Sequence, residues 1–226
     1  MYLLVGFIVG FFIPFIARRL GKILPATTGV LIYHLIHLPR IAHAHNPLQT
    51  KLLKKRWALL FANALFMSII TAALFALAHY LLPENAFVYA TLFIWLILCA
   101  ASVDARFFVL PDCLTIPLLL GGFLFSVMTP LITPQQCAYG ALFAYTITIL
   151  AVFVSAQMRY NIFGGGDSKM IIALGSWLGI EGINYTLLLS FFLFLIHSFW
   201  KKDKTGAYGP ALSLAGLLCF FILYAK

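Results

Sequence analysis

The chain has 226 residues, of which 63% are hydrophobic and only 9% are charged. Soluble domains are about half apolar and about a quarter charged, so this composition excludes an ordinary soluble domain and predicts a membrane protein. The net charge of +9 would raise the question of nucleic acid in a soluble protein, but in a membrane protein such an excess usually sets topology.

Hydrophobic segments recur along the chain and predict an all-α, polytopic transmembrane helix bundle with about eight spans. A spanning helix needs about 20 mainly apolar residues. The segments that fit are 1–17, 57–82, 86–103, 114–128, 138–158, 170–180, 183–200 and 207–224. We expect two parts, an N-terminal anchor with a short basic loop (residues 1–56) and the remaining transmembrane bundle (residues 57–226).

The basic residues predict the orientation of this bundle. If the N-terminus lies outside, every Lys and Arg except Lys226, of 15 in total, falls on the inner side of the membrane. This distribution satisfies the positive-inside rule, and the opposite orientation violates it. Positive residues follow the first apolar segment, which predicts an uncleaved anchor. The basic excess is thereby explained by topology and by anionic membrane lipid, and nucleic acid is not expected as a partner.

The longest predicted loop, residues 18–56, contains an apolar stretch at 29–41 that is typical of an interfacial or re-entrant helix. No carboxylate or cysteine accompanies the histidines of this loop, which are His34, His37, His43 and His45. A surface loop is therefore a better interpretation than a metal site. The four cysteines of the chain lack C-x-x-C spacing, so no metal is expected.

Three of the six acidic residues lie at the inner ends of predicted helices, namely Asp104, Asp112 and Asp167. An ionised carboxylate near hydrocarbon is costly, so such residues are candidates for a functional site. Asp112 follows Pro111 and opens an apolar segment, which predicts a helix N-cap. Asp104 closes a helix, where burial and the dipole both disfavour negative charge, so we expect it to hold a proton. A salt bridge between Asp104 and Arg106 is the alternative interpretation.

Asp167 follows Gly164, Gly165 and Gly166 and opens the next helix. Glycines permit positive φ and let a substrate backbone approach closely. The helix N-terminus favours an ionised Asp167, although an N-cap in a glycine-rich turn is an alternative. Two close carboxylates share one proton. Helix polarity therefore predicts that Asp167 is the general base and Asp104 the general acid of a pair that hydrolyses a peptide bond.

These motifs resemble the type IV prepilin peptidase family of bacterial inner-membrane proteases. Val103-Asp104 is followed at +7 and +8 by Pro111-Asp112, and then by the segment 114–117, Leu-Thr-Ile-Pro. The G-x-G-D element occurs at 164–167, with Lys169 two places on. Residues 208–214, Tyr-Gly-Pro-Ala-Leu-Ser-Leu, are similar to a third family segment. The resemblance covers about residues 86–220.

The resemblance implies an aspartic endopeptidase of the G-x-G-D type that removes the short leader from type IV prepilins or pseudopilins at the cytoplasmic face of the inner membrane. Asp104 and Asp167 then correspond to its catalytic pair. The supporting motif residues are Gly164, Gly166, Lys169, Asp112 and Pro111. Proteolysis of this kind needs no cofactor, and the sequence does not name the substrate among pilins and pseudopilins.

Many family members carry two C-x-x-C pairs in the loop after the first span and also N-methylate the product with S-adenosylmethionine. This loop has no cysteine, so the resemblance leaves methylation undecided. A presenilin or signal-peptide-peptidase type protease is an alternative, and Pro210-Ala211-Leu212 is a P-A-L tripeptide near the C-terminus, whereas the Pro111-Asp112 motif favours the prepilin enzyme. An ion-coupled transporter is a further alternative, but no inverted repeat is detected.

Overall fold

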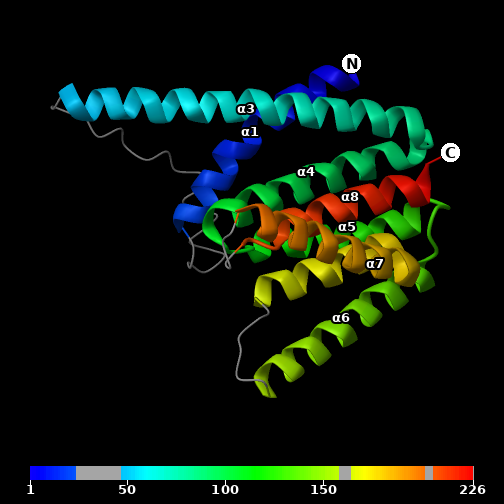
Figure 1. Ribbon diagram of the computed structural model, residues 1–226. Helices are drawn as coiled ribbons and strands as arrows, with labels where there is room; N and C mark the ends of the chain where they lie inside the picture. Colours follow the sequence, from blue (N-terminus) through cyan, green and yellow to red (C-terminus); the bar gives the residue numbers. More distant parts are fainter. Residues whose placement is uncertain (24–46, 158–163, 202–205, 226) are drawn as a thin grey trace.

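The computed structural model describes residues 1–23, 47–157, 164–201 and 206–225. Within these ranges all regular secondary structure is helical (Figure 1). The elements are α1 (Tyr2–Ile23), α3 (Pro47–Leu81), α4 (Glu84–Phe107), α5 (Asp112–Met128), α6 (Pro134–Gln157), α7 (Gly165–Lys201) and α8 (Gly209–Tyr224). Each predicted span corresponds to one of these helices or to one part of α7, which confirms the all-α class. The predicted interfacial helix and the loop histidines lie outside the described residues.

The described helices have the length and composition of membrane spans. Five stretches are long and apolar enough to cross a membrane, namely Tyr2–Gly21, Trp57–Leu81, Glu84–Phe107, Pro134–Gln157 and Gly165–Trp200. Outward-facing side chains such as Phe66, Leu150 and Phe153 are about 60% exposed, as lipid-facing residues would be. The protein is a multi-pass membrane protein, and the number of spans and the side of the N-terminus stay predictions.

Helix α7 is divided at Gly179, which has φ of 67° and ψ of −173°. Glycine adopts such a positive φ without the steric cost that a Cβ would bring. The chain turns back there, so that residues 180–201 return toward the end of the bundle where α7 begins (Figure 1). This confirms the predicted separation into two apolar segments, with the boundary a few residues earlier than expected.

Aromatic rings from four helices form the centre of the bundle. The ring centroid of Phe93 on α4 lies 4.8 Å from that of Trp177 on α7 and 4.6 Å from that of Phe220 on α8. The ring of Phe125 on α5 stacks on Trp177 at 5.1 Å. The Trp177 indole N–H also donates to the carbonyl oxygen of Leu118 at 2.6 Å. These contacts fix α4, α5, α7 and α8 relative to one another, and the predicted aspartates lie on these helices.

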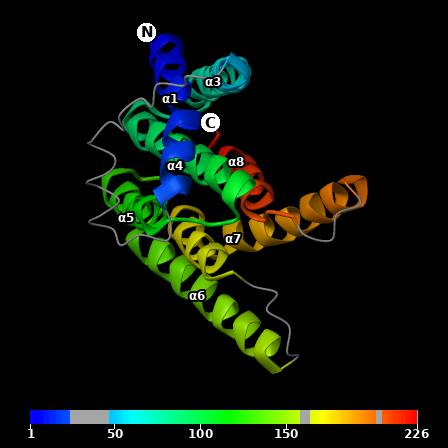
Figure 2. The same cartoon turned by 90° about the vertical axis from the view of Figure 1, so that its left-hand side faces the viewer.

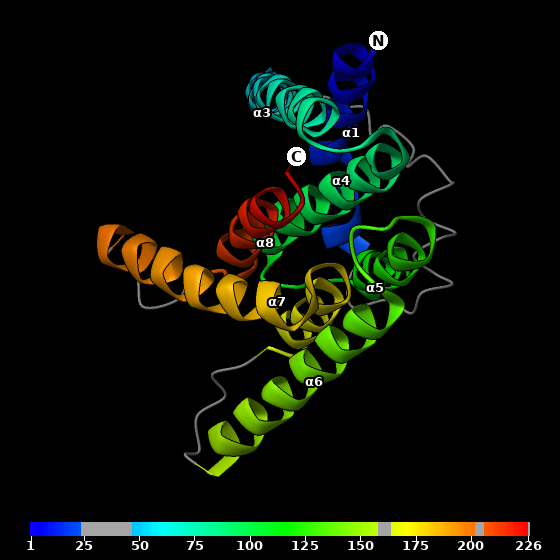
Figure 3. The same cartoon turned by 90° about the vertical axis from the view of Figure 1, so that its right-hand side faces the viewer.

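Small residues allow the peripheral helices to approach closely. Gly6 and Gly10 of α1 lie against α3, where a Cβ on either would come within 2.8 Å of the α3 backbone. Gly140 of α6 and Gly175 of α7 face each other with no room for a side chain on either. Beyond this contact α6 diverges from the bundle (Figures 2 and 3). Close backbone contact at small residues is a common mode of helix association in membranes.

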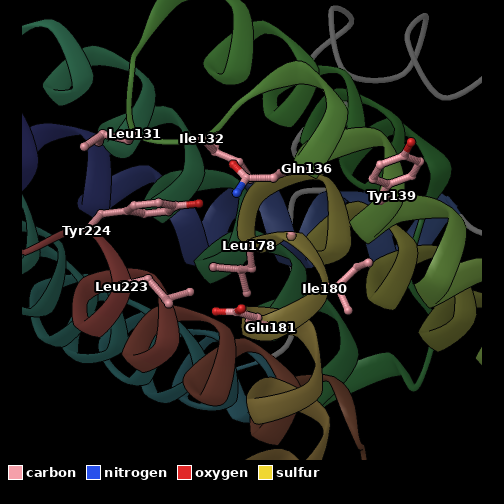
Figure 4. Close-up of a pocket in the computed structure, with 10 residues that line it drawn as sticks. Leu131, Ile132, Gln136, Tyr139, Leu178, Ile180, Glu181, Leu223 and Tyr224 are labelled. Atoms are coloured by element: carbon pink, nitrogen blue, oxygen red, sulfur yellow. The ribbon is translucent and has the colours of Figure 1, made fainter.

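A cavity of about 340 Å³ lies at the end of the bundle where α7 turns (Figure 4). Polar groups on its walls come from Gln136 and Tyr139 of α6, Glu181 of α7 and Tyr224 of α8. The predicted aspartates lie at the opposite ends of their helices, because α5 and the first part of α7 start at the other end of the bundle. This cavity is therefore separate from the predicted site.

Candidate active site

The motifs predicted from the sequence meet at one end of the bundle. The backbone N–H of Gly209, at the start of α8, donates to Oδ2 of Asp104 near the end of α4 at 2.8 Å. Asp104 also interacts electrostatically with Asp167 in the first turn of α7. Three separate segments of the chain thus surround one pair of carboxyl groups.

Asp104 is only 5% exposed, although it lies one turn from the end of α4. The helix ends at Phe108, a non-glycine residue with a φ of 54°, whose N–H donates to the carbonyl oxygen of Asp104 at 2.9 Å. This left-handed cap turns the chain into the short segment before α5 and fixes the last turn of α4. The alternative ion pair with Arg106 is not found, since Arg106 is exposed and Asp104 is buried.

The Gly209 hydrogen bond acts against the expected protonation of Asp104. The unfavourable dipole of α4 contributes roughly 0.3–1 kcal/mol against the carboxylate. A hydrogen bond to a charged acceptor contributes about 1.5–3 kcal/mol. It comes here from the first turn of α8, whose positive end also favours a negative charge. The contribution from α8 therefore exceeds the dipole contribution from α4, while the burial of Asp104 still opposes its ionisation.

Asp167 is the third residue of α7 and is partly exposed. The N-cap interpretation of this residue is wrong, because α7 begins at Gly165. Tyr208, the residue before Gly209, interacts electrostatically with Asp167, and its hydroxyl shares a 2.5 Å hydrogen bond with Ser190. Burial, helped by the charge of Asp167, raises the pKa of the Tyr208 phenol, which therefore stays neutral at physiological pH.

The Tyr208 contacts also show how closely α7 folds back. Asp167 lies before the turn at Gly179 and Ser190 lies after it, yet both interact with Tyr208. In a straight helix these two residues would be about 35 Å apart, at 1.5 Å per residue. The division of α7 at Gly179 is therefore what brings its second part to the aspartate pair.

The G-x-G-D element has a steric explanation in this structure. A Cβ on Gly164 would lie 3.3 Å from Oδ2 of Asp167, and one on Gly166 would lie 2.8 Å from Cβ of Leu110. A Cβ on Gly165 would meet nothing within 4 Å. The predicted positive φ is wrong for these three glycines, since Gly179 is the glycine with positive φ in the described part of the chain. The close approach in the structure is that of Leu110 from the α4–α5 connection to Gly166, and the approach of a substrate backbone stays a prediction.

The predicted capping role of Asp112 is also wrong. The N-cap position of α5 is Pro111, and no side-chain capping hydrogen bond forms there. Asp112 is the first residue of α5, and its Oδ1 accepts a hydrogen bond from Nζ of Lys169 at 2.5 Å. The two side chains are 46% and 52% exposed, so this ion pair contributes at most about 1 kcal/mol. It connects the start of α5 with the start of α7, next to the catalytic candidates.

An apolar groove of about 510 Å³ opens beside the pair. Ala105 and Phe108 come from the end of α4, next to Asp104, and Pro210 follows Gly209 on α8. Phe194 and His197, from the second part of α7, form the facing wall. The groove is therefore mostly lipophilic, and the chain neighbours of Asp104 and Gly209 line it, although neither aspartate does.

Tyr208 and Gly209 lie in the segment 208–214 that resembles the family, but neither they nor Ser190 were predicted as site residues. A Gly-Pro pair at the start of an apolar segment is typical of a helix N-terminus, and this signal identifies the start of α8. Nothing in the sequence indicates that this terminus faces Asp104. Within the described residues no group of three or more His, Cys, Asp or Glu side chains could hold a metal ion, and the expectation of a metal-free site stays a prediction.

Residues 90–199 match the type IV leader peptidase family. Proteins named prepilin leader peptidase/N-methyltransferase are similar to the chain. That of Klebsiella pneumoniae is 34% identical over 127 residues, which cover 55% of each chain. That of Vibrio cholerae is 27% identical over 125 residues, which cover 53% of this chain and 49% of the relative. That of Escherichia coli K12 is 28% identical over 225 residues, which cover 96% of this chain and 93% of the relative.

The matches thus span about half the length of the first two relatives and nearly all of the third. No solved structure matches the chain. The region that matches the family contains both Asp104 and Asp167 and ends before Tyr208 and Gly209.

Proposed function

The chain belongs to the type IV leader peptidase family, and we therefore propose that it is a membrane-embedded aspartic endopeptidase that removes the leader from prepilins or pseudopilins. The observation that carries this proposal is the interaction of Asp104 with Asp167 at one end of the bundle, within the region that matches the family. Two such carboxyl groups can share one proton, which is the state that aspartic proteolysis requires.

The reaction needs one carboxylate and one carboxylic acid. The carboxylate removes a proton from water as the water oxygen attacks the carbonyl carbon of the scissile peptide bond. The carboxylic acid gives its proton to the carbonyl oxygen, which forms a tetrahedral diol. The C–N bond then breaks as the proton held by the first carboxyl passes to the leaving nitrogen. A hydroxyl proton of the diol returns to the second carboxyl, so that the pair again holds one proton.

We place the protein in the bacterial inner membrane with the aspartate pair on the cytoplasmic side. The distribution of Lys and Arg supports this orientation, because the loops that contain or adjoin both aspartates are those with the basic residues. The groove beside Asp104 supports a substrate with apolar residues next to its scissile bond, since its walls are mostly hydrophobic.

N-methylation is not part of this proposal. S-adenosylmethionine carries ribose hydroxyls and a positive sulfonium, which carboxylates commonly recognise. The described walls of the groove beside Asp104 present His197 and Ser198 as polar side chains, and no acidic one. The groove therefore does not fit this cofactor.

The experiment is co-expression with a prepilin in cells that lack their own leader peptidase, with the precursor and product separated on a gel. Asp104→Asn and Asp167→Asn should each abolish processing while membrane insertion is retained. Glu181→Gln provides the control, because Glu181 is an exposed acid at the opposite end of the bundle. Normal processing by either aspartate variant would refute the proposal.

A further inference from the structure

The two carboxyl oxygens of Asp104 are not equivalent. Oδ2 accepts the Gly209 N–H at 2.8 Å. Oδ1 accepts no hydrogen bond from the described residues. One oxygen is therefore held by a backbone N–H, and the other has no donor in the described part of the chain.

The backbone at Gly209 lies so close to the Asp104 carboxyl group that only glycine fits at this position. A Cβ at this position would lie 2.6 Å from Oδ2 of Asp104 and 2.8 Å from its Cγ. Proline at position 210 fixes the first turn of α8, where its missing N–H costs nothing. The N–H of Gly209 is thus directed at the carboxyl group by the start of a helix that the aromatic centre holds in place.

Asp167 differs from Asp104 in this respect. Its carboxyl group accepts no hydrogen bond from the described residues, and its neighbours are the Asp104 carboxyl and the neutral Tyr208 phenol. Burial and the end of α4 oppose a negative charge on Asp104, and the first turn of α7 favours one on Asp167. The N–H of Gly209 acts in the opposite direction, because it stabilises the Asp104 carboxylate directly and Asp167 accepts no such bond from the described residues.

We propose that Gly209 is a positioning residue whose backbone N–H keeps Asp104 ionised, so that Asp104 is the general base and Asp167 the general acid. This inference rests on the proposed function, and it reverses the assignment made from helix polarity in the sequence. Oδ1 of Asp104 takes the proton from the attacking water, and Asp167 gives its proton to the carbonyl oxygen. The Asp104 proton then passes to the leaving nitrogen, and Asp167 regains its proton from the diol.

The test removes the N–H without adding a side chain. Glycolic acid introduced at position 209 by nonsense suppression in a cell-free system replaces the amide with an ester. Lactic acid at position 211 is the matched control, because it removes a different N–H from the same helical turn. Rates of prepilin cleavage are measured against pH for the wild type and both esters. Among the described residues, the charged and titratable groups at this end of the bundle include Asp167, Tyr208, the exposed Arg106, the Asp112–Lys169 pair and the α1 residues Arg18, Arg19 and Lys22, and none of them is altered.

The expected result is a shift of the acidic limb of the pH–rate profile upward by about one to two pH units in the 209 ester, with little change in the 211 ester. The sign follows from the role of a base, which must lose its proton before it can act. If Asp104 were the acid, the same ester would shift the alkaline limb upward instead. A shift of the alkaline limb, or a loss of rate with neither limb moved, would overturn the proposal.

A second measurement needs no substrate and separates this proposal from the proposed function. Asp104 labelled with ¹³C at its carboxyl group is titrated in bilayers by infrared spectroscopy, which is practicable because the chain has only six acidic residues. The labelled carboxyl should lose its proton before Asp167 does, and the 209 ester should delay this loss. If the wild type cleaves no prepilin but the titration follows this order, the proposed function fails and the charge assignment holds. If the label loses its proton second, the assignment fails whether or not the protein is a peptidase.

Discussion

Alanine placed in turn at Gly164, Gly165 and Gly166 is expected to have three different effects, because the three glycines have different surroundings. The added Cβ meets nothing at position 165, the Asp167 carboxyl at 3.3 Å at position 164, and Cβ of Leu110 at 2.8 Å at position 166. The prediction is that position 165 tolerates alanine, position 164 loses activity, and position 166 loses both stability and activity.

The magnitudes follow from these contacts. Gly165→Ala should be neutral or stabilising by up to ~1 kcal/mol, since alanine reduces the entropy of the unfolded chain. Gly166→Ala forces apart two segments near their backbones, and such overpacking costs about 1–3 kcal/mol. At position 164 the Asp167 side chain must move by a few tenths of an ångström. A misplacement of ~1 Å costs about 100-fold in rate, so we expect a loss of roughly three- to tenfold there.

The assay combines two measurements on the same purified variants. Prepilin cleavage gives the activity, and thermal unfolding followed by tryptophan fluorescence gives the stability, since Trp177 is fully buried in the centre of the bundle. Gly165→Ala serves as the internal control for mutation of a glycine in this turn. The steric explanation is refuted if Gly165→Ala is as damaging as Gly166→Ala, or if Gly166→Ala is both stable and active.

Three further predictions concern the surroundings of the pair. In a double-mutant cycle, Asp112→Asn and Lys169→Met should show a coupling below about 1 kcal/mol that decreases with salt, because the pair is half exposed; a larger coupling would contradict this. Tyr208→Phe removes the bond to Ser190 and should cost about 1 kcal/mol of thermal stability. Since burial raises the pKa of this phenol, the variant should keep the wild-type pH–rate profile below pH 9, and a changed profile would show that the phenol titrates. Thr115→Val should leave thermal stability unchanged or raise it, because the buried Thr115 hydroxyl has no partner among the described residues, and a loss would reveal one.

The helices and the general position of the site were predictable from the sequence. Hydrocarbon forces each apolar segment to satisfy its own backbone hydrogen bonds, so long apolar runs become helices. The charge distribution then puts the end of α4 and the start of α7 on one side, which brings Asp104 and Asp167 to the same end of the bundle. Both steps depend on composition along the chain, and they need no knowledge of tertiary contacts.

The environment of each aspartate was not predictable, because it is supplied by distant segments. At Asp104 the sequence indicated burial and the dipole of α4, whereas the N–H that its carboxyl group accepts comes from Gly209 in another helix. Asp112 has the sequence of an N-cap, but Lys169 binds its carboxylate instead. Gly166 has the composition of a flexible turn, but its role is to admit Leu110. Local sequence patterns identify these residues as candidates for the site, whereas tertiary packing decides which groups each of them contacts.

The lengths of the helices around the pair have a consequence for the surrounding bilayer. Helices α5 and α8 have 17 and 16 residues, or ~26 and ~24 Å, and residues 165–178 extend ~21 Å. A typical hydrocarbon layer is about 30 Å thick. Lipid next to these helices must thin or bend to match them, at a cost of fractions of a kcal/mol per ångström. The proposed cleavage of prepilin should therefore depend on acyl-chain length, and chains that match these short helices should favour it.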